Sequence, residues 1–168
     1  MKKKFLFMMF VSQVFFLSCK KEENQRYVNK KEKKWIEYSL QFPDTVEINK
    51  SYTGIIRYES ILDTITTDFD DKKNNRYTIF YLTIVNNPLK DNSEKLKKIA
   101  LKFGADNNRI IPFEDIKFDK VGIYYIDGII HDFAVIELNK KNESGEDLVR
   151  LIENEERVSH KVIVVNRK

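Results

Sequence analysis

Apolar and polar residues alternate with a period of two through most of the chain after residue 35, and this pattern constrains the fold more than any other feature. Successive side chains of a β-strand point to opposite faces of the sheet, so the alternation predicts strands that are buried on one side. The run 77–85 is apolar or aromatic on both faces, which favours a central strand covered on both sides. Residues 61–69 alternate in the same way and predict another strand.

Two turn signals and one helical segment complete the predicted secondary structure. Asp127-Gly128 lies between two apolar runs and predicts a tight hairpin, because glycine accepts a positive φ. The polar residues 154–156 predict a second hairpin between two further runs. Residues 92–103 carry apolar side chains at helical spacing and end before Gly104, which predicts one amphipathic crossover helix with its apolar stripe in the core.

Several short strands with turns and one crossover helix predict an antiparallel β-sandwich over residues 35–168. The stretch from Asp119 to Tyr124 resembles the Asp-x-Gly-x-Tyr corner of immunoglobulin-like domains, with one extra residue before Gly122. In that family the tyrosine hydroxyl braces a loop, so the resemblance implies a structural role for Tyr124. Ile126 stands where such domains can carry a disulfide cysteine. We therefore expect an immunoglobulin-like, cysteine-free sandwich.

The first eighteen residues have the pattern of an export signal. Three lysines precede the apolar run from Phe5 to Leu17. A helix needs roughly 18 or more apolar residues to cross a bilayer core of about 30 Å, so this run is too short to span stably. A basic start, a short apolar stretch and a small residue before a cut are typical of a secretory signal. We therefore leave residues 1–18 out of the predicted fold.

The end of this run, Phe16-Leu17-Ser18-Cys19, resembles the lipobox of bacterial lipoproteins, although that family usually has leucine where this chain has Phe16. The resemblance implies cleavage between Ser18 and Cys19, a diacylglyceryl group on the Cys19 thiol and a palmitate-type acyl chain on its amine. Several acyl chains hold a protein stably on a membrane, whereas one binds marginally. Cys19 is the only cysteine, so the chain has no internal disulfide. The alternative is a plain secretory signal.

Residues 19–34 form a charged tether between the anchor and the domain. Its first residues, Lys20-Lys21-Glu22-Glu23, resemble the signal that some Gram-negative bacteria place after the lipidated cysteine to send lipoproteins to the cell surface. The resemblance implies a surface-facing position on the outer membrane, and the periplasmic face is the alternative. Lysines at the end of the tether are expected to stay solvated or to contact anionic lipid head groups.

The charge balance of the domain excludes a nucleic-acid-binding surface. The whole chain carries a net charge of +4, but residues 35–168 hold 20 basic and 23 acidic side chains, a net of −3. The alkaline balance therefore belongs to the signal and the tether. Binding to nucleic acid requires a concentrated basic face, which the domain does not provide.

Motifs for catalysis are lacking. The two histidines, His131 and His160, are too few for a zinc site without a free cysteine, and we interpret them as satisfied or solvated side chains. The chain has no Gly-x-Ser-x-Gly elbow, and five glycines form no phosphate-binding loop. We therefore expect no cofactor and no enzyme activity. Paired carboxylates acting as a hydrolase remain the alternative.

One acidic cluster could supply oxygen ligands to calcium. It lacks the glycine and the terminal glutamate of a helix-loop-helix calcium site, and basic residues follow it at once, so a solvated turn is the preferred interpretation. The cluster consists of Asp63, Asp68, Asp70 and Asp71.

Taken together, the sequence predicts a noncatalytic, lipid-anchored envelope protein whose β domain binds a protein or a glycan. An exposed apolar patch or an unpaired sheet edge would support this interpretation. A deep pocket with two facing carboxylates would favour the hydrolase alternative, and binding of calcium would identify a calcium-stabilised adhesion-type module.

Overall fold

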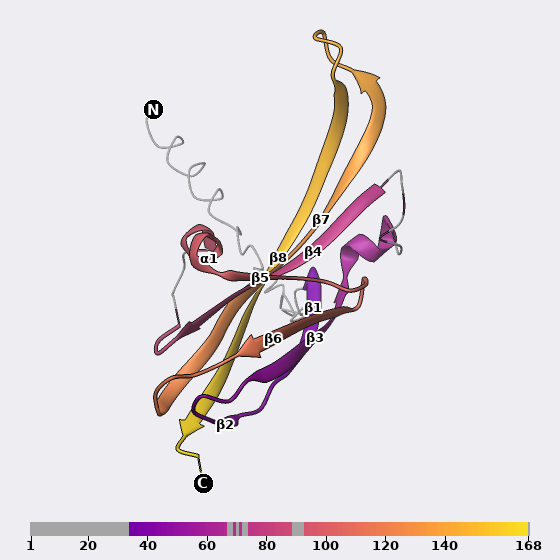
Figure 1. Cartoon of the computed structure of the whole chain (residues 1–168). Helices are drawn as coiled ribbons and strands as arrows, with labels where there is room; N and C mark the ends of the chain where they lie inside the picture. The colour runs from indigo at the N-terminus through magenta and orange to yellow at the C-terminus, as the bar shows by residue number, and fades with distance from the viewer. Residues whose placement is uncertain (1–33, 67–68, 70, 72–73, 89–92, 168) are drawn as a thin grey trace, which may run out of the picture. The chain divides into compact units, whose positions relative to one another are not determined.

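The structure is a computed structural model that describes residues 34–167, apart from 67–68, 70, 72–73 and 89–92. The expected signal, lipidation site, export signal and most of the tether therefore lie outside the described residues. Residues 33–168 form one compact unit, which is mainly β with its strands in two sheets (Figure 1). Among the described residues, no helix has the length and apolar content needed to cross a bilayer.

Ten elements follow one another along the chain: β1 (Ile36–Gln41), β2 (Thr45–Glu47), β3 (Tyr52–Ser60), the 3₁₀ helix η1 (Ile61–Thr64), β4 (Asn74–Val85), α1 (Ser93–Ile99), β5 (Leu101–Gly104), β6 (Ile110–Ile116), β7 (Gly122–Lys141) and β8 (Asp147–Val165).

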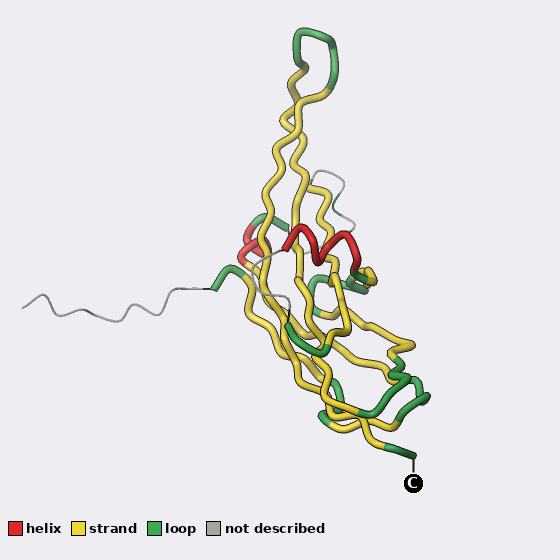
Figure 2. Tube along the Cα trace, turned by 90° about the vertical axis from the view of Figure 1, so that its left-hand side faces the viewer, coloured by secondary structure: helices red, strands yellow, loops and turns green. Residues whose placement is uncertain are grey.

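The strands form a three-stranded sheet with the order β1-β3-β6 and a five-stranded sheet with the order β2-β8-β7-β4-β5. All neighbours are antiparallel except β2, which runs parallel to the end of β8. The coarse prediction of a two-sheet β fold is confirmed. The helix α1 packs on the outer face of the larger sheet (Figure 2). There, Lys97 Nζ contacts Glu155 Oε1 at 2.6 Å.

The inner faces of the two sheets enclose the core, and large phenylalanine rings meet there. Phe113 of β6 lies 5.6 Å from Phe80 of β4 between ring centroids. Each of these rings fills the space opposite a glycine of a neighbouring strand, because a Cβ on Gly54 would lie 2.1 Å from Phe113 and one on Gly128 would lie 2.4 Å from Phe80. Both glycines are therefore required by close packing.

The two predicted hairpins are wrong. Asp127-Gly128 lies in the middle of β7, and residues 154–156 lie in the middle of β8, so each pair of predicted strands is one long strand. Gly128 does not form a turn; its missing side chain leaves room for the Phe80 ring, which packs against it. The actual turn joins β7 to β8, where Gly145 has a φ of 82° and the Asn142 side chain hydrogen-bonds Glu146. Positive φ favours glycine, so Gly145 was the local signal for this turn.

The predicted helix over 92–103 and the predicted strand over 61–69 also need correction. The helix ends at Ile99, and residues 101–104 form β5 because they hydrogen-bond along the edge of β4. Leu96 is buried as expected, but Ile99 is exposed. In the segment 61–69, the Ser60 hydroxyl oxygen accepts a hydrogen bond from Leu62 N at the start of η1, and the Asp63 carboxylate accepts one from the Ser60 N–H. A capping box therefore overrides the alternation there.

Candidate functional site

The hairpin of β7 and β8 projects beyond the rest of the larger sheet. Strand β4 pairs with β7 only as far as Asn74, which lies opposite Ile136. Asn74 is the first residue of β4, and both its backbone N–H and its side-chain amide donate hydrogen bonds to the Asp71 carboxylate in the preceding loop. Residues 137–149, which we call the distal hairpin, therefore form a ribbon of only two strands (Figure 1).

The outer edge of β8 has no described strand partner along most of its length, although β1 side chains contact it at residues 156–159. Strand β2 covers only residues 163–165, so the rest of this edge has no strand partner among the described residues. Two contacts show which backbone groups point to that edge: Ile163 N donates to Asp44 O at 2.8 Å, and Arg157 O accepts from the Tyr38 hydroxyl at 3.0 Å. Alternate residues of a strand share this direction. The N–H and C=O groups of Val149, Leu151 and the following odd-numbered residues therefore face outward.

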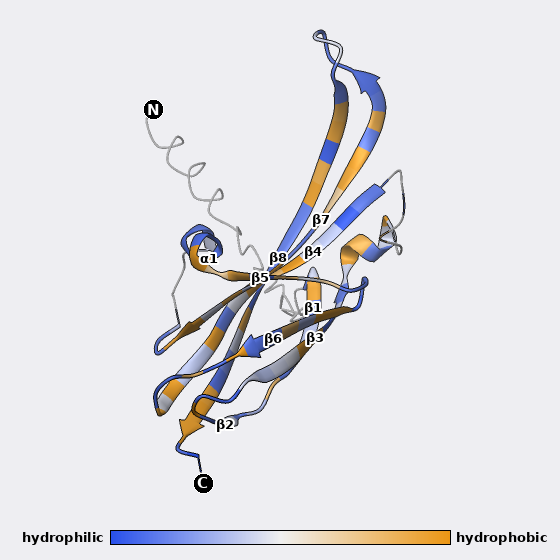
Figure 3. Cartoon of the chain, in the orientation of Figure 1, coloured by the Kyte–Doolittle hydropathy of each residue, from blue (hydrophilic) through white to orange (hydrophobic). Residues whose placement is uncertain are grey.

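The tip of the distal hairpin is mostly hydrophilic, but exposed apolar side chains lie on both faces of the ribbon at its base and on the adjoining part of β8 (Figure 3). Val149 and Leu151 are 53% and 54% exposed on one face, and Leu138 and Leu148 are also exposed. An isolated two-stranded hairpin is marginally stable in water, and an open apolar edge is a template for pairing. This end of the molecule therefore has the properties of an interaction surface.

A row of aromatic rings continues this surface along the outer face of the larger sheet. The ring centroids of Tyr77 and Phe133 are 5.4 Å apart, those of Phe133 and His131 are 4.9 Å apart, and those of His131 and Tyr81 are 6.3 Å apart. Lys102 Nζ lies 5.6 Å from the Tyr81 ring centroid. Val135 stands next to Phe133 on the same face and joins the aromatic row to the distal hairpin.

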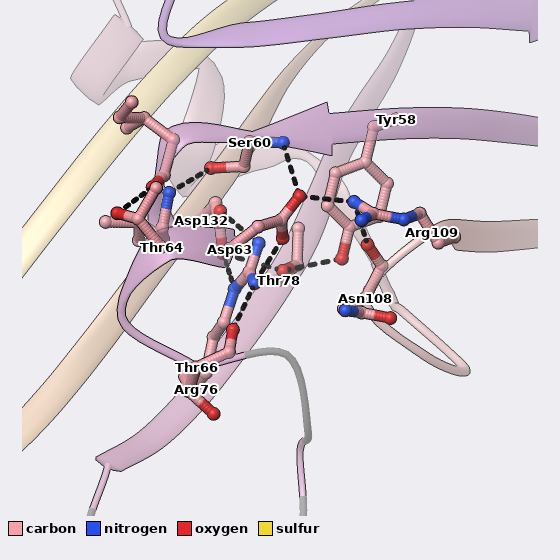
Figure 4. A network of polar contacts seen from close by, with 12 residues as sticks. Tyr58, Ser60, Asp63, Thr64, Thr66, Arg76, Thr78, Asn108, Arg109 and Asp132 are labelled. Carbon is pink, nitrogen blue, oxygen red and sulfur yellow. Dashed lines mark hydrogen bonds and ion pairs between the residues drawn. The ribbon is translucent and has the colours of Figure 1, made fainter.

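Beneath these surfaces, a network of charged groups lies between the two sheets (Figure 4). The guanidinium of Arg76 is fully buried and makes a bidentate pair with Asp132, at 2.9 Å for Nε and 2.8 Å for Nη2. Arg76 Nη1 also contacts Asp63 Oδ1 at 2.6 Å and the Thr66 carbonyl at 3.0 Å. Thr78 donates its hydroxyl hydrogen to Asp132 at 2.8 Å. The pair thus has the additional hydrogen bonds that a buried ion pair requires.

The network reaches the surface through Asp63, and the buried Tyr58 extends it within the interior. Asp63 Oδ2 forms an ion pair with Arg109, whose side chain is partly exposed. Burial raises the pKa of Asp63, but the hydrogen bonds from Arg109 and Arg76 outweigh it and hold that pKa below its ordinary value. Burial raises the pKa of Tyr58 to about 12. The neutral Tyr58 hydroxyl lies 2.9 Å from Thr78 Oγ1 and can donate to it.

The rim of this network borders a groove on the outer face of the smaller sheet, which we call the Trp35 groove. It consists of two adjoining hollows of about 420 and 240 Å³ that share Glu37 and Glu59. Arg57 and Arg109 line the larger hollow, and Trp35 lines the smaller one. The sequence-based prediction missed this groove, because its residues come together only through the pairing of β1 with β3.

Two residues of the expected calcium cluster lie in the described part of the chain, and each is held by different partners. Asp63 is held by two arginines, Asp71 ends the loop before β4, and Asp68 and Asp70 lie outside the described residues. No group of three or more histidine, cysteine, aspartate or glutamate side chains among the described residues is arranged to hold a metal ion. His131 and Asp132 point to opposite faces as expected, because His131 faces outward and Asp132 is fully buried.

No family model and no curated protein matches this chain. The functional interpretation therefore depends on the surfaces and the buried network described above.

Proposed function

We propose that this chain is a noncatalytic lipoprotein of the cell envelope whose distal hairpin binds an extended segment of another envelope protein. The observation that carries the proposal is the open edge of β8 beside exposed apolar side chains. In strand addition, main-chain hydrogen bonds supply affinity and alternate side chains supply specificity. An added strand would meet Val149 and Leu151 on one face and Arg150 and Ile152 on the other, so it would itself carry apolar residues on both faces.

Anchoring through acyl chains on Cys19 is the second part of the proposal and is supported by the lipobox-like sequence. The mature protein then stands off an outer membrane on its charged tether, facing the cell surface. Replacement of Cys19 by alanine should release the protein from membranes into the soluble fraction. Protease treatment of intact cells should remove the domain while a periplasmic control protein survives. Survival of the domain until the outer membrane is broken would place it on the periplasmic face instead.

A glycan is the second candidate ligand, and the aromatic row from Tyr77 to Tyr81 favours it. Tyr77 is 52% exposed, and its ring could stack on a sugar. The two candidates differ in the groups they use: strand addition needs the backbone edge at Val149 and Leu151, whereas a glycan needs the Tyr77 and Phe133 rings. A Tyr77→Ala variant that loses ligand while edge variants keep it would favour the glycan.

Paired carboxylates support the hydrolase alternative less well. Glu37 and Glu59 face each other across β1 and β3, but both are exposed in an open groove. Glycoside hydrolysis uses one carboxyl that an apolar surrounding keeps protonated beside another that stays ionised. The buried carboxylates of Asp127 and Asp132 and the partly buried one of Asp63 are already held by arginines. The geometry therefore favours binding over catalysis.

The immunoglobulin-like relation of the sandwich is also a proposal, which rests on the stretch from Asp119 to Tyr124. Gly122 begins β7 with a φ of 151°, and the Tyr124 ring packs 5.3 Å from the Phe118 ring between centroids. If Tyr124 braces the corner through its hydroxyl, Tyr124→Phe should lower the melting temperature. An unchanged melting temperature would remove the main support for this relation.

In-cell photo-crosslinking tests the binding proposal without knowledge of the ligand. A photoreactive phenylalanine analogue at Leu151 should form a protein adduct, and the same analogue at Glu114 on the smaller sheet should not. A second substitution, Val149→Pro, removes an outward-facing N–H and should abolish the adduct, because proline is tolerated at edges but cannot donate to an added strand. Lys161→Pro removes another outward-facing N–H outside the apolar segment and serves as the matched control, which should keep the adduct. Equal adducts from Leu151 and Glu114, or persistence of the adduct in Val149→Pro, would refute the proposal.

A further inference from the structure

A second group of exposed apolar side chains lies at the end of the larger sheet opposite the distal hairpin, where β7 begins and β8 ends (Figure 1). Ile123 and Ile163 are cross-strand partners there. Both face outward, because the alternate residues Val162 and Val164 are buried in the core. Together with two neighbouring valines they form what we call the proximal patch, whose side chains are 39–52% exposed: Val121, Ile123, Ile163 and Val165.

Two cations without ionic partners flank the row of this patch that lies on β8. Lys161 lies two residues before Ile163 and shares its face of the sheet, and Arg167 follows the end of β8 by two residues. Both are exposed, and neither takes part in an ion pair among the described residues. Glu47 of β2 is the acidic residue paired with this row, and Lys50 Nζ lies 3.9 Å from it. The row therefore has an excess of positive charge beside its apolar side chains.

The kinds of side chain in the proximal patch favour a lipid surface over a protein partner. A contiguous exposed apolar patch marks an interaction site. The residues that dominate protein–protein binding are mostly tryptophan, tyrosine and arginine, whereas leucine and valine are under-represented. The proximal patch consists of valine and isoleucine alone. Binding to a membrane surface depends on buried apolar area and on cations that attract anionic lipids, and this end of the sheet provides both.

The proposed lipid anchor brings a membrane within reach of the proximal patch. Lys34 Nζ contacts Glu156 at 2.7 Å, so the chain enters the domain beside the middle of β8. Ile163 lies seven residues further along that strand, which is about 23 Å. The 15 residues from Lys20 to Lys34 span at most about 50 Å. A bilayer that holds acyl chains on Cys19 can therefore also meet the patch.

We propose that the proximal patch rests on an anionic lipid bilayer, with its aliphatic side chains at the boundary between head groups and acyl chains. Lys161 and Arg167 then lie among the head-group phosphates. The inference rests on the proposed anchor at Cys19, because the anchor keeps the domain close to the membrane.

This contact leaves the proposed binding edge free. Leu151 lies twelve residues before Ile163 on β8, which is about 40 Å along the strand. The distal hairpin and the proximal patch therefore occupy opposite ends of the same two strands (Figure 1). The membrane contact and strand addition at the distal hairpin can take place together.

The test uses the full mature protein, purified from membranes in detergent and reconstituted on preformed vesicles. Ile123→Cys introduces one free thiol, because Cys19 is the only other cysteine and is acylated in the anchored protein. An environment-sensitive nitrobenzoxadiazole label on this thiol should shift its emission to shorter wavelength on vesicles of phosphatidylcholine and phosphatidylglycerol in equal parts. The shift should be smaller on phosphatidylcholine alone. The same label at Glu114→Cys, on the exposed face of the smaller sheet, should show no shift on either vesicle.

A charge variant and its matched control separate the patch from general attraction. Lys161→Gln with Arg167→Gln should lower the ratio of membrane-contacting to free domain about 25-fold, at about fivefold for each charge. Arg57→Gln with Lys140→Gln removes the same charge from exposed positions outside the patch and should leave that ratio within about twofold.

The outcomes distinguish the contact from the anchor. Protein that floats with the vesicles while the label at residue 123 keeps its emission in water overturns the membrane contact alone and leaves the patch to a protein partner. Equal shifts at residues 123 and 114, or equal effects of the two charge variants, also overturn it. Protein that does not float with the vesicles refutes the anchor and, with it, the contact.

Discussion

The replacement of Asp132 by alanine should be among the most damaging single substitutions in this domain. Asp132 is fully buried and accepts three hydrogen bonds, two from Arg76 and one from Thr78. Its loss leaves the fully buried guanidinium with Asp63 and one carbonyl as its remaining partners. Removal of one member of a buried ion pair costs about 3–5 kcal/mol, because the other charge stays buried without compensation.

The free energy of unfolding is measured by urea denaturation, monitored by circular dichroism. In a thermal scan of the same variant, a loss of about 3–5 kcal/mol corresponds to a fall of about 10–18 °C in the melting temperature of a domain of this size. Asp147→Ala is the matched control, because Asp147 contacts Lys141 at 3.7 Å with both side chains exposed. Exposed pairs of this kind contribute about 0–1 kcal/mol.

A second variant separates the charge effect from the loss of packing. The double substitution Arg76→Met and Asp132→Leu removes both charges and retains apolar volume, so it should be more stable than Asp132→Ala alone. If Asp132→Ala loses less than about 1 kcal/mol, or if the double variant is the less stable one, the pair does not carry the energy assigned to it.

Three further predictions concern the network, the core and the hairpin. Because the folded pKa of Asp63 is lowered, its contribution to stability is present above the unfolded pKa of about 3.9 and is lost as the pH falls through the folded value; Asp63→Asn should therefore flatten the acid limb of the stability curve, and an unchanged limb would contradict this. Gly128→Ala should cost about 1–3 kcal/mol in urea denaturation, because its Cβ would lie 2.5 Å from the Tyr81 carbonyl oxygen as well as against Phe80; an equally large effect of Gly104→Ala, where nothing lies within 4 Å, would refute the packing argument. Leu151→Lys should slow aggregation of the purified protein with little change in melting temperature, because Leu151 is exposed at an open edge; faster aggregation would contradict this.

Local patterns failed where contacts distant in the sequence decided the structure. Asp127-Gly128 has the composition of a hairpin turn, yet Gly128 lies within β7 because the Phe80 ring occupies the space that a side chain would need. Residues 101–104 continue a helical pattern, yet they pair with β4 and satisfy their backbone groups in a sheet. Propensity is a weak influence that tertiary contacts override.

What the sequence alone determined is the β class of the domain, because alternation with a period of two is a local property that only strands can satisfy on one buried face. The mainly β composition, the strand over residues 77–85 and the opposite orientations of His131 and Asp132 all follow from it. Only the tertiary structure decided the pairing of the strands. That pairing brings Arg76 beside Asp132 across 56 residues, places Glu37 opposite Glu59 and leaves the edge of β8 open. Such juxtapositions depend on register between distant segments, and alternation fixes which face a residue occupies without fixing its neighbour.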